Sequence, residues 1–409
     1  MLVCESNCTA CGACKNICPT DSVFYHYDLF GVKKADIDNE KCLHCDQCKK
    51  TCPIIDRPEG NLSFKCYAAW SLDPEVRNQS ASGGLATEMY KYAAQNGWWF
   101  VGTIFDDEKN CVYDMERNDP YKFYGSKYTY SDTKNIFREI EEKLKMGEHV
   151  LFIGIPCHVA ALKKYMEQKH LDSSLVLSVD LVCHGVVPED YLKSHISYIE
   201  NRKEIKAEHI SFRDPESYTY TFTFALRNSG KVFYRKKANR NDLYQIGYHK
   251  GIIYRDNCYN CCFANEKRQG DLTLADFGGV GSVEKCEYDN KNVSCVLANT
   301  QRGDSFLNAI HSKQSIFMEE RPINEEYFSE ARLHTPTPLS AERSAFLKNY
   351  EKYRLFERAM NNAARKIIIK NETRYYLHID QIRTLAARIL PSGIKKKMKG
   401  LLKLKGAGK

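Results

Sequence analysis

Two groups of four cysteines near the start of the chain have the spacing of iron–sulfur ligands. The first group is Cys8, Cys11, Cys14 and Cys18, and the second is Cys42, Cys45, Cys48 and Cys52; a proline follows each group. Thiolates in this C-x-x-C-x-x-C-x-x-x-C-P pattern hold four-iron clusters, and the fourth cysteine of each group ligates the other cluster. We therefore predict two [4Fe-4S] clusters, in which Cys52 completes the first set and Cys18 the second. Two complete copies favour clusters over zinc knuckles or disulfides.

Four of the remaining cysteines could form a third ligand set. Cys157 follows the apolar run 150–155, and Cys183 follows the run 179–182, so each stands where a buried strand is expected to end. Functional residues gather at the carboxyl ends of strands in α/β folds. Cys258 and Cys261 form a C-x-x-C pair in a loop that could close over these ends. The spacing alone leaves a third cluster, free thiols and a structural zinc as alternatives.

Three glycine-bearing segments are candidates for binding a phosphate or cofactor. Residues 80–87 include Ser82, Gly83, Gly84 and Thr87 and open a helix, where free N–H groups and hydroxyls can hold an anion, although a simple helix cap would look the same. Residues 125–128 offer a hydroxyl, a cation and an aromatic ring. Residues 270–279 carry glycines that let the backbone approach a ligand closely.

The hydrophobic pattern predicts the elements that position these residues. Apolar runs at 64–70, 98–105, 149–155 and 175–182 indicate buried strands, and helical periodicity occurs at 84–95, 133–146, 157–168 and 188–203. We therefore expect an α+β ferredoxin-like module over 1–60, an α/β flavin-binding body in two parts over 63–147 and 148–315, and a helical, basic region over 316–409. An antiparallel insertion is expected around 208–235.

The composition predicts a cytoplasmic protein that does not span a membrane and that has a basic C-terminal region. No apolar stretch approaches the length of a membrane helix, and we expect a cytoplasmic protein in which the 18 cysteines are reduced. Residues 365–409 hold 13 Lys or Arg against two acidic residues, whereas the whole chain carries +8. This basic region could contact the inner face of an anionic membrane or be a solvated terminus; we do not expect nucleic acid binding.

Taken together and in order, six segments of the chain resemble the coenzyme F420 hydrogenase/dehydrogenase beta-subunit family. The segments are Ser82-Gly83-Gly84 with Thr87, Gly125-Ser126-Lys127-Tyr128, Gly154-Ile155-Pro156-Cys157, Asp180 to Gly185, Phe212-Arg213-Asp214, and Cys258 to Thr273. The resemblance covers roughly residues 5–310 and includes bacterial members encoded with exopolysaccharide or capsule genes. His158 in place of a common glutamine, and Ala275-Asp276-Phe277-Gly278 in place of a glycine and tryptophan version, are departures from the family pattern.

The resemblance implies a flavin-dependent iron–sulfur oxidoreductase. It implies FAD contacts at Ser82, Gly83, Gly84, Thr87, Ser126, Lys127, Tyr128, Asp271, Thr273 and Asp276, and a third [4Fe-4S] cluster at Cys157, Cys183, Cys258 and Cys261. His158 and His184 flank this site and are candidates for proton delivery. Expected partners are an organic substrate and an external electron donor or acceptor, namely ferredoxin, flavodoxin or reduced deazaflavin. Alternatives are an F420-dependent beta subunit and a non-enzymatic electron-transfer adaptor; a role in polysaccharide biosynthesis is a further expectation.

Overall fold

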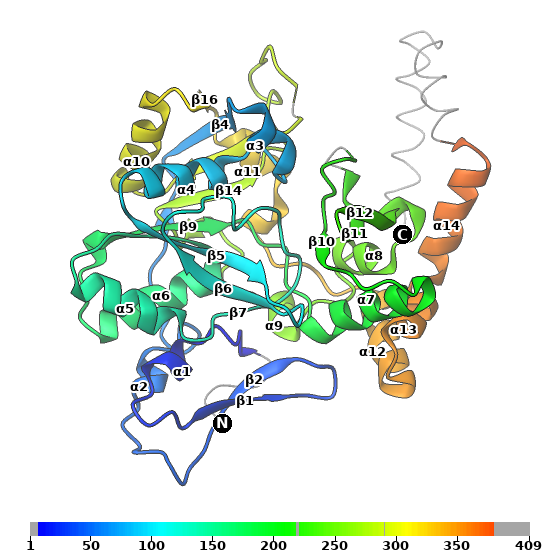
Figure 1. Cartoon of the computed structure of the whole chain (residues 1–409), viewed down its shortest axis with the longest axis horizontal. Coiled ribbons are helices and arrows are strands. Elements are labelled where there is room, and N and C mark those ends of the chain that lie inside the picture. The colour runs from blue at the N-terminus through cyan, green and yellow to red at the C-terminus, as the bar shows by residue number, and fades with distance from the viewer. Residues whose placement is uncertain (1–6, 218–220, 290, 380–409) are drawn as a thin grey trace.

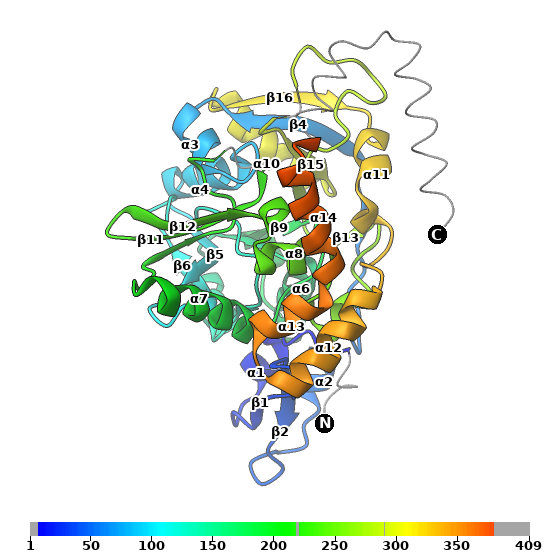
Figure 2. The ribbon, with the colours of Figure 1, turned by 90° about the vertical axis from the view of Figure 1, so that its right-hand side faces the viewer.

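The computed structural model describes residues 7–217, 221–289 and 291–379. A nine-stranded sheet with helices on both faces forms the body, a small N-terminal module lies beneath it, and a lobe of helices and three short strands lies at its side (Figure 1). The perpendicular view in Figure 2 shows the same three parts, with the module again at the lower end. This arrangement confirms the mixed α/β class with a ferredoxin-like N-terminal region.

The N-terminal module is organised by its cysteines. Helix α1 (Ala13–Ile17) begins inside the first cysteine group, and α2 (Gln47–Lys50) begins inside the second. Between them, β1 (Val23–Tyr27) and β2 (Lys33–Ile37) form an antiparallel hairpin. The small core combines Val23 and Ala35 of this hairpin with cysteine side chains. With so few apolar residues, the module depends on its ligands and on the body for stability.

The body contains one continuous mixed sheet. In spatial order its strands are β16 (Ile316–Arg321), β4 (Lys65–Ser71), β15 (Ser294–Ala298), β14 (Leu272–Asp276), β9 (Val176–Leu181), β8 (Val150–Gly154), β5 (Trp99–Phe105), β6 (Cys111–Glu116) and β7 (Ser131–Asp132). Strands β14, β9, β8 and β5 run parallel, and β4 has the same direction because β15 is antiparallel to both β4 and β14. The carboxyl ends of five strands therefore lie at one edge of the sheet.

Helices bury both faces of this sheet. On one face, α4 (Leu85–Gln95), which follows α3 (Pro74–Gln79), and α10 (Gln301–Ser312) pack Met89 and Leu307 against the strands. On the other face, α5 (Ile136–Lys145) and α6 (Pro156–Gln168) pack Phe137 and Leu162 against Phe152, and Ile17 of the module joins the same core. The strands are apolar on both faces because both are covered, as in other parallel sheets.

The lobe has a separate aromatic core. It comprises α7 (Glu189–Lys203), β10 (His209–Ser211), β11 (Thr223–Asn228), β12 (Lys231–Lys237), α8 (Leu243–His249), α12 (Ala341–Tyr353), α13 (Phe356–Ala363) and α14 (Arg365–Tyr376). Its core includes Tyr191, Phe224, Tyr244 and Phe356. Short elements join the parts: β3 (Asn61–Leu62) pairs with β13 (Lys267–Arg268), α9 (Asp256–Tyr259) carries part of the C-x-x-C pair, and α11 (Asn324–Ser329) follows β16.

The expected strands and helices of the body correspond to β4, β5, β8, β9, α4, α5, α6 and α7 within a few residues, and the antiparallel insertion corresponds to β10–β12. Two expectations are corrected. Strand β16 lies beyond the boundary expected at residue 315 yet pairs with β4 in the body sheet. The expected C-terminal tail is partly built into the lobe, because α12 and α13 contribute Phe346, Phe356 and Met360 to its core. The end of that tail, 380–409, lies outside the described residues.

Candidate functional site

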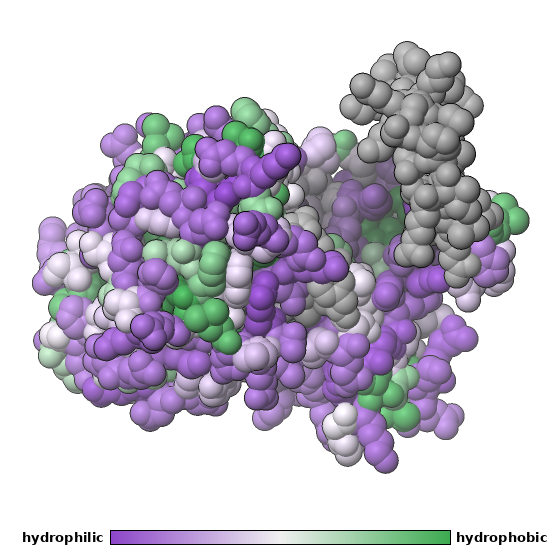
Figure 3. All heavy atoms as spheres, turned by 90° about the horizontal axis from the view of Figure 1, so that it is seen from above, coloured by the Kyte–Doolittle hydropathy of each residue, from purple (hydrophilic) through white to green (hydrophobic). Residues whose placement is uncertain are grey.

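A deep pocket of about 440 Å³ opens at the edge of the sheet where the five strands end. The body supplies one wall, and the lobe supplies the other through Arg213, Phe222, Tyr248 and His249. Seen from above, the surface is hollowed between the body and the lobe (Figure 3). The pocket thus lies where α/β sheets usually bind ligands, in the crevice beyond the carboxyl ends of strands.

The loop between α3 and α4 contributes hydroxyls and a helix N-terminus to the pocket. Ser82, Gly84 and Thr87 line the pocket, and Gly84 begins α4 with a φ of 87°, which favours glycine. Gly83 lies behind them: its N–H donates to Ser294 Oγ over 2.9 Å, and a Cβ there would lie 2.5 Å from the carbonyl oxygen of Ala69. Gly83 therefore allows the loop to pack on the sheet and does not itself line the pocket.

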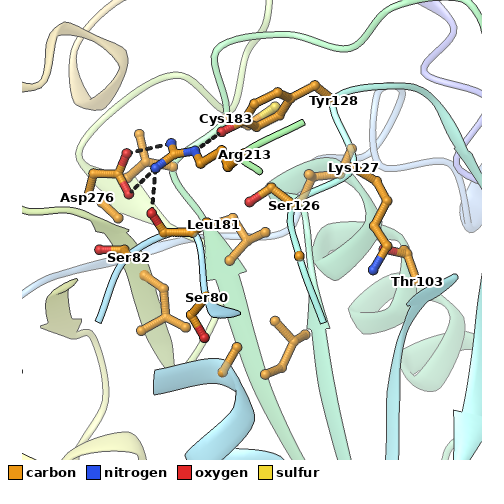
Figure 4. Close-up of a pocket in the computed structure, with 18 of the residues that line it drawn as sticks. Ser80, Ser82, Thr103, Ser126, Lys127, Tyr128, Leu181, Cys183, Arg213 and Asp276 are labelled. Carbon is orange, nitrogen blue, oxygen red and sulfur yellow. Dashed lines mark hydrogen bonds and ion pairs between the residues drawn. The ribbon is translucent and has the colours of Figure 1, made fainter. Parts of the chain in front are cut away.

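The second glycine segment also lines the pocket. Ser126 and Tyr128 border it, and Lys127 extends beside them toward Thr103 (Figure 4). The ammonium group of Lys127 donates to the carbonyl oxygens of Phe123 (3.1 Å) and Tyr124 (2.8 Å). Burial lowers the pKa of Lys127 to about 8. This lysine can therefore exchange a proton near neutral pH inside the pocket.

Arg213 ties the lobe to the body across the pocket. Its guanidinium forms an ion pair with Asp276 at the end of β14, 2.6 Å apart, and donates to the Tyr128 hydroxyl over 2.5 Å (Figure 4). It also donates to the carbonyl of Ala81 over 2.7 Å, and the Phe222 ring lies 4.5 Å from it. Sequence reasoning placed Arg213 in a motif but did not assign it to the site; Phe222, Tyr248 and His249 carried no local signal.

Four cysteines behind the pocket form a third thiol group. Cys183 lines the pocket itself, and Cys258 accepts a hydrogen bond from the Val186 N–H at 3.4 Å. Burial raises the pKa of Cys157, with smaller contributions from the neighbouring Cys261, Cys183 and Cys258. Cys157 therefore lies near enough to the other three cysteines of the predicted third set to be affected by their charges.

The N-terminal cysteines separate into two further groups. Burial raises the pKa of Cys11 to about 12, and the charge of Cys52 makes the next largest contribution to this rise. Cys11 and Cys52 therefore lie near each other although they are 41 positions apart in the chain. Burial also raises the pKa of Cys48, and Cys18 and Cys42 contribute to that shift. Cys52 thus lies near the first group and Cys18 near Cys48 of the second, as the predicted exchange of fourth cysteines requires. Cys45 is exposed, so the second group lies at the surface.

The three thiol groups follow one another toward the pocket. The charge of Cys48 in the second group contributes to raising the pKa of Cys14 in the first group. In the same way, the charge of Cys11 in the first group contributes to raising the pKa of Cys157 in the third. The first group therefore lies near both of the others. Cys183 completes the series because it belongs to the third group and lines the pocket.

Side chains of the body hold the module in place. Arg255, only 1% exposed, donates to the carbonyl oxygens of Cys8 (3.1 Å) and Lys33 (2.9 Å). Arg138 donates to the carbonyl of Cys18 over 2.9 Å, and the Tyr130 hydroxyl donates to that of Ala10 over 2.6 Å. Charged donors to buried carbonyls form stronger hydrogen bonds than neutral ones. The first thiol group is thereby fixed relative to the third.

The two candidate proton donors lie in different environments. His184 lines the pocket, is half-exposed, and pairs through Nε2 with Glu330 at 3.2 Å. His158 is fully buried behind Tyr113, with Nδ1 3.0 Å from the tyrosine oxygen, and its Nε2 has no hydrogen-bond partner among the described residues. Burial lowers the pKa of His158 to about 3, so its ring is neutral. The structure therefore places His184, and not His158, where it could reach a ligand.

Asp271 and Thr273 lie outside the pocket, contrary to the expected flavin contacts. Asp271 directly precedes β14, whereas Asp276 is the last residue of that strand, five positions further on. The Asp271 carboxylate accepts hydrogen bonds from Ser178 and forms an ion pair with Arg302, 2.8 Å apart. The Thr273 hydroxyl is buried and donates to a carboxylate of the neighbouring strand over 2.6 Å. Both side chains hold strands together at positions below the pocket.

The donor chemistry fits the implied groups. Four thiols for each of three sites match the Cys₄ ligation of [4Fe-4S] clusters. Hydroxyls beside the N-terminus of α4 suit a pyrophosphate, and the adjoining apolar and aromatic walls suit a flat ring system. Among the described residues, no three His, Cys, Asp or Glu side chains are grouped as ligands of a single metal ion. None of the described helices is long and apolar enough to cross a membrane.

Comparisons with known proteins match two regions of the chain to described families. Residues 147–325 match the family described as the C terminus of the coenzyme F420 hydrogenase/dehydrogenase beta subunit, and residues 7–54 match the 4Fe-4S dicluster domain. The F subunit of the F(420)H(2) dehydrogenase of Methanosarcina mazei is 24% identical over 339 residues, covering 77% of this chain and 85% of that protein. The beta subunit of the coenzyme F420 hydrogenase of Methanosarcina barkeri is 22% identical over 178 residues, covering 41% and 60%.

A solved structure of the F420-reducing [NiFe] hydrogenase complex from Methanosarcina barkeri has a chain that is 16% identical with a TM-score of 0.46, covering 76% of this chain and 93% of its own. The family matches confirm the resemblance found in the cysteine and glycine motifs. The relatives are named as subunits of oxidoreductases. The chain is therefore similar to the 4Fe-4S dicluster domain over residues 7–54 and to the C-terminal region of the coenzyme F420 hydrogenase/dehydrogenase beta subunit over residues 147–325.

Proposed function

We propose that this iron–sulfur protein is a flavin-dependent oxidoreductase that binds FAD in the pocket and a third [4Fe-4S] cluster in the third thiol group. The observation that carries the proposal is the position of Cys183, which lines the pocket and belongs to the third thiol group. Cys157 of the same group lies near Cys11 of the module. This series supports electron exchange between the surface of the module and a ligand in the pocket.

The proposed groups would supply complementary redox chemistry. Clusters carry single electrons, and FAD, when bound, would convert between single electrons and the electron pairs that organic substrates exchange. The protein's part is to hold these groups and to manage protons. Thr87 and the first backbone N–H groups of α4 would bind the pyrophosphate beside Ser82, whose hydroxyl donates to the Val293 carbonyl over 2.8 Å. Arg213 would hold the wall formed by Tyr128 and Asp276 in place.

Proton handling falls to groups at the pocket. His184, whose side chain is 50% exposed, pairs at the pocket rim with Glu330, whose side chain is 19% exposed, so the histidine can contact both water and a ligand. Burial alone would raise the pKa of Glu330, but the hydrogen bond and charge of His184 outweigh it and keep that pKa lowered. The carboxylate therefore stays ionised beside the histidine. We assign the pair a role in delivering a proton to the substrate.

Iron analysis after anaerobic purification tests the third cluster. The proposal expects about twelve iron atoms per chain for three four-iron clusters, and about eight for two. Cys157→Ser should lose about a third of the iron. Cys262→Ser is the matched control, because Cys262 adjoins Cys261 but is not among the third group's ligands, and it should keep the full iron content. Full iron in Cys157→Ser would exclude the third cluster.

Flavin analysis tests the pocket. Ser126 borders the pocket, and Ser126→Trp should fill part of it and abolish flavin binding while leaving the iron content unchanged. Ser312→Trp at the exposed end of α10 is the control and should retain flavin. A wild-type protein without flavin but with about eight iron atoms would be an electron-transfer adaptor for a partner reductase, and the flavoenzyme proposal would be wrong.

A reduced deazaflavin is a second candidate electron source, because the relatives are named for coenzyme F420. We propose testing it against reduced ferredoxin and flavodoxin by following the bleaching of cluster absorbance under anaerobic conditions. Reduction by deazaflavin should be lost in Ser126→Trp, since that donor would react at the pocket. Reduction by ferredoxin should persist, since it would act at the exposed second thiol group. The role in polysaccharide biosynthesis stays a prediction.

A further inference from the structure

Helix α14 forms the outer edge of the lobe (Figure 1, Figure 2). Its inner side is fixed: Ile367 and Ile368 pack against the lobe core, and the Asn371 amide donates to Asn241 Oδ1 over 2.9 Å. Because a helix turns 100° per residue, positions 365, 366, 369, 370, 376 and 377 then face away from the lobe. The orientation of the outward side therefore follows from the packing of the inner side.

The outward side of α14 combines cations with exposed apolar residues. Ile369 is 52% exposed and Tyr376 is 73% exposed, and Leu377 directly after the helix is 59% exposed. The same side carries three cations, Arg365, Lys366 and Lys370, whose side chains form no hydrogen bond or ion pair with another described residue. Charges without partners and large exposed apolar groups on one helix side are typical of a binding surface.

The sequence after the helix has the same composition. Residues 380–409 contain nine Lys or Arg and a single acidic residue, Asp380. Leucine, isoleucine and methionine alternate with these cations up to residue 405. The basic and apolar character of the α14 side thus continues along the chain.

We propose that the outward side of α14 docks on an anionic lipid membrane, to which the nine cations in the sequence of residues 380–409 would also be attracted. Cations attract acidic headgroups, while Tyr, Leu and Ile side chains enter the interface between headgroups and acyl chains. A nucleic acid would engage the cations but would leave Ile369, Tyr376 and Leu377 without a role. The inference goes beyond the proposed redox function and does not depend on it, since α14 contributes no residue to the pocket.

Vesicle co-sedimentation of the full-length protein tests the proposal. Binding is expected to vesicles of phosphatidylcholine with phosphatidylglycerol, to weaken with added salt, and to be absent with phosphatidylcholine alone. The charge variant Lys366→Glu/Lys370→Glu should weaken binding by at least about 25-fold, because each cation near the surface contributes about fivefold. The apolar variant Tyr376→Ser/Leu377→Ser should also weaken it.

Phe328→Ser provides the matched control. Phe328 is an even more exposed apolar residue, at 80%, on α11, and its loss should leave vesicle binding unchanged. Circular dichroism should show that every variant keeps the wild-type helix content, because the substituted side chains are exposed and lie outside the lobe core. Equal binding of the α14 variants and the control, binding to neutral vesicles, or displacement of the vesicles by duplex DNA at equal affinity would each overturn the proposal.

Discussion

Replacing Asp276 by Asn should loosen the contact between the lobe and the body. The Asp276 side chain is 28% exposed and that of Arg213 only 9%, so the substitution removes the charge that balances a nearly buried guanidinium. Breaking a fully buried pair costs about 3–5 kcal/mol. Arg213 keeps its hydrogen bonds to Ala81 and Tyr128, and water reaches the aspartate, so we expect about 2–3 kcal/mol.

Amide hydrogen exchange can measure this loss of free energy in the segments that form the contact between the lobe and the body. A loss of about 2–3 kcal/mol raises the exchange rate of segments that open with the pair by about 30- to 150-fold. The affected segments should be residues 211–217 of the lobe and 272–276 of the sheet, while α5 and α6 keep their protection. In a double-mutant cycle, adding Arg213→Met to Asp276→Asn should not lower the stability of the contact further, because the ion pair is already broken. The coupling energy between the two substitutions should therefore be about 2 kcal/mol.

Asp289→Asn is the control for this measurement. Asp289 and Lys291 also form an ion pair, 3.4 Å apart, but both side chains are more than 60% exposed. Exposed pairs contribute about 0–1 kcal/mol. If Asp276→Asn changed exchange no more than Asp289→Asn does, or if the cycle were additive, Arg213 would not be what connects the two walls of the pocket.

Three further predictions concern buried charges. Burial, together with Glu330 and Asp276, raises the pKa of Glu326 well above its ordinary value, so protection of α11 should fall by about 1.4 kcal/mol per pH unit above pH 4.5, and Glu326→Gln should abolish that slope. Burial disfavours the charged form of His195, but Asp242 and Glu357 outweigh this effect and raise the pKa of His195 to about 9. The protonated histidine should therefore contribute about 3 kcal/mol of stability below pH 6.5, and this contribution should vanish as the pH rises through 9. His195→Gln should remove this dependence of stability on pH. Arg255→Met should lower protection of residues 7–37 by about 2–5 kcal/mol through two unpaired carbonyls, and wild-type protection would contradict that anchor.

Much of the body could be predicted because its central strands are buried on both faces. Strand β8 is a continuous apolar run, and β9 is apolar except for Ser178 and Asp180; apolar runs this short between turn signals indicate buried strands by their length. Strand β14 was predicted as a cofactor loop because its flanking glycines dominate the segment 270–279. Strand β16 was missed because IFMEER is only half apolar, and its place beside β4 depends on pairing with residues about 250 positions earlier.

The candidate site was predictable where ligands are close in sequence and not where they meet through folding. Spacing alone grouped the eight N-terminal cysteines. Asp271 and Asp276 seemed equivalent in one glycine-rich segment, but five residues of strand separate them by about 16 Å, so only Asp276 reaches the pocket. Cys157 and His158 are neighbours at the start of α6, yet a helix turns 100° between them. The Cys157 thiol therefore lies near Cys183, whereas the His158 imidazole lies behind Tyr113.

The contacts between module and body show how a metal-binding loop can be fixed without losing ligands. Arg255, Arg138 and Tyr130 donate to backbone carbonyl oxygens of the cysteine loops, including those of Cys8 and Cys18, and none of these three donates to a thiol. The sulfur atoms thus remain available to iron while the backbone that carries them is held. Loosening one of these anchors should therefore change the distance between the first and third thiol groups while the number of iron atoms bound stays the same. Under the proposed function, electron transfer to the pocket would depend on that distance and should slow in Arg255→Met even when its clusters are complete.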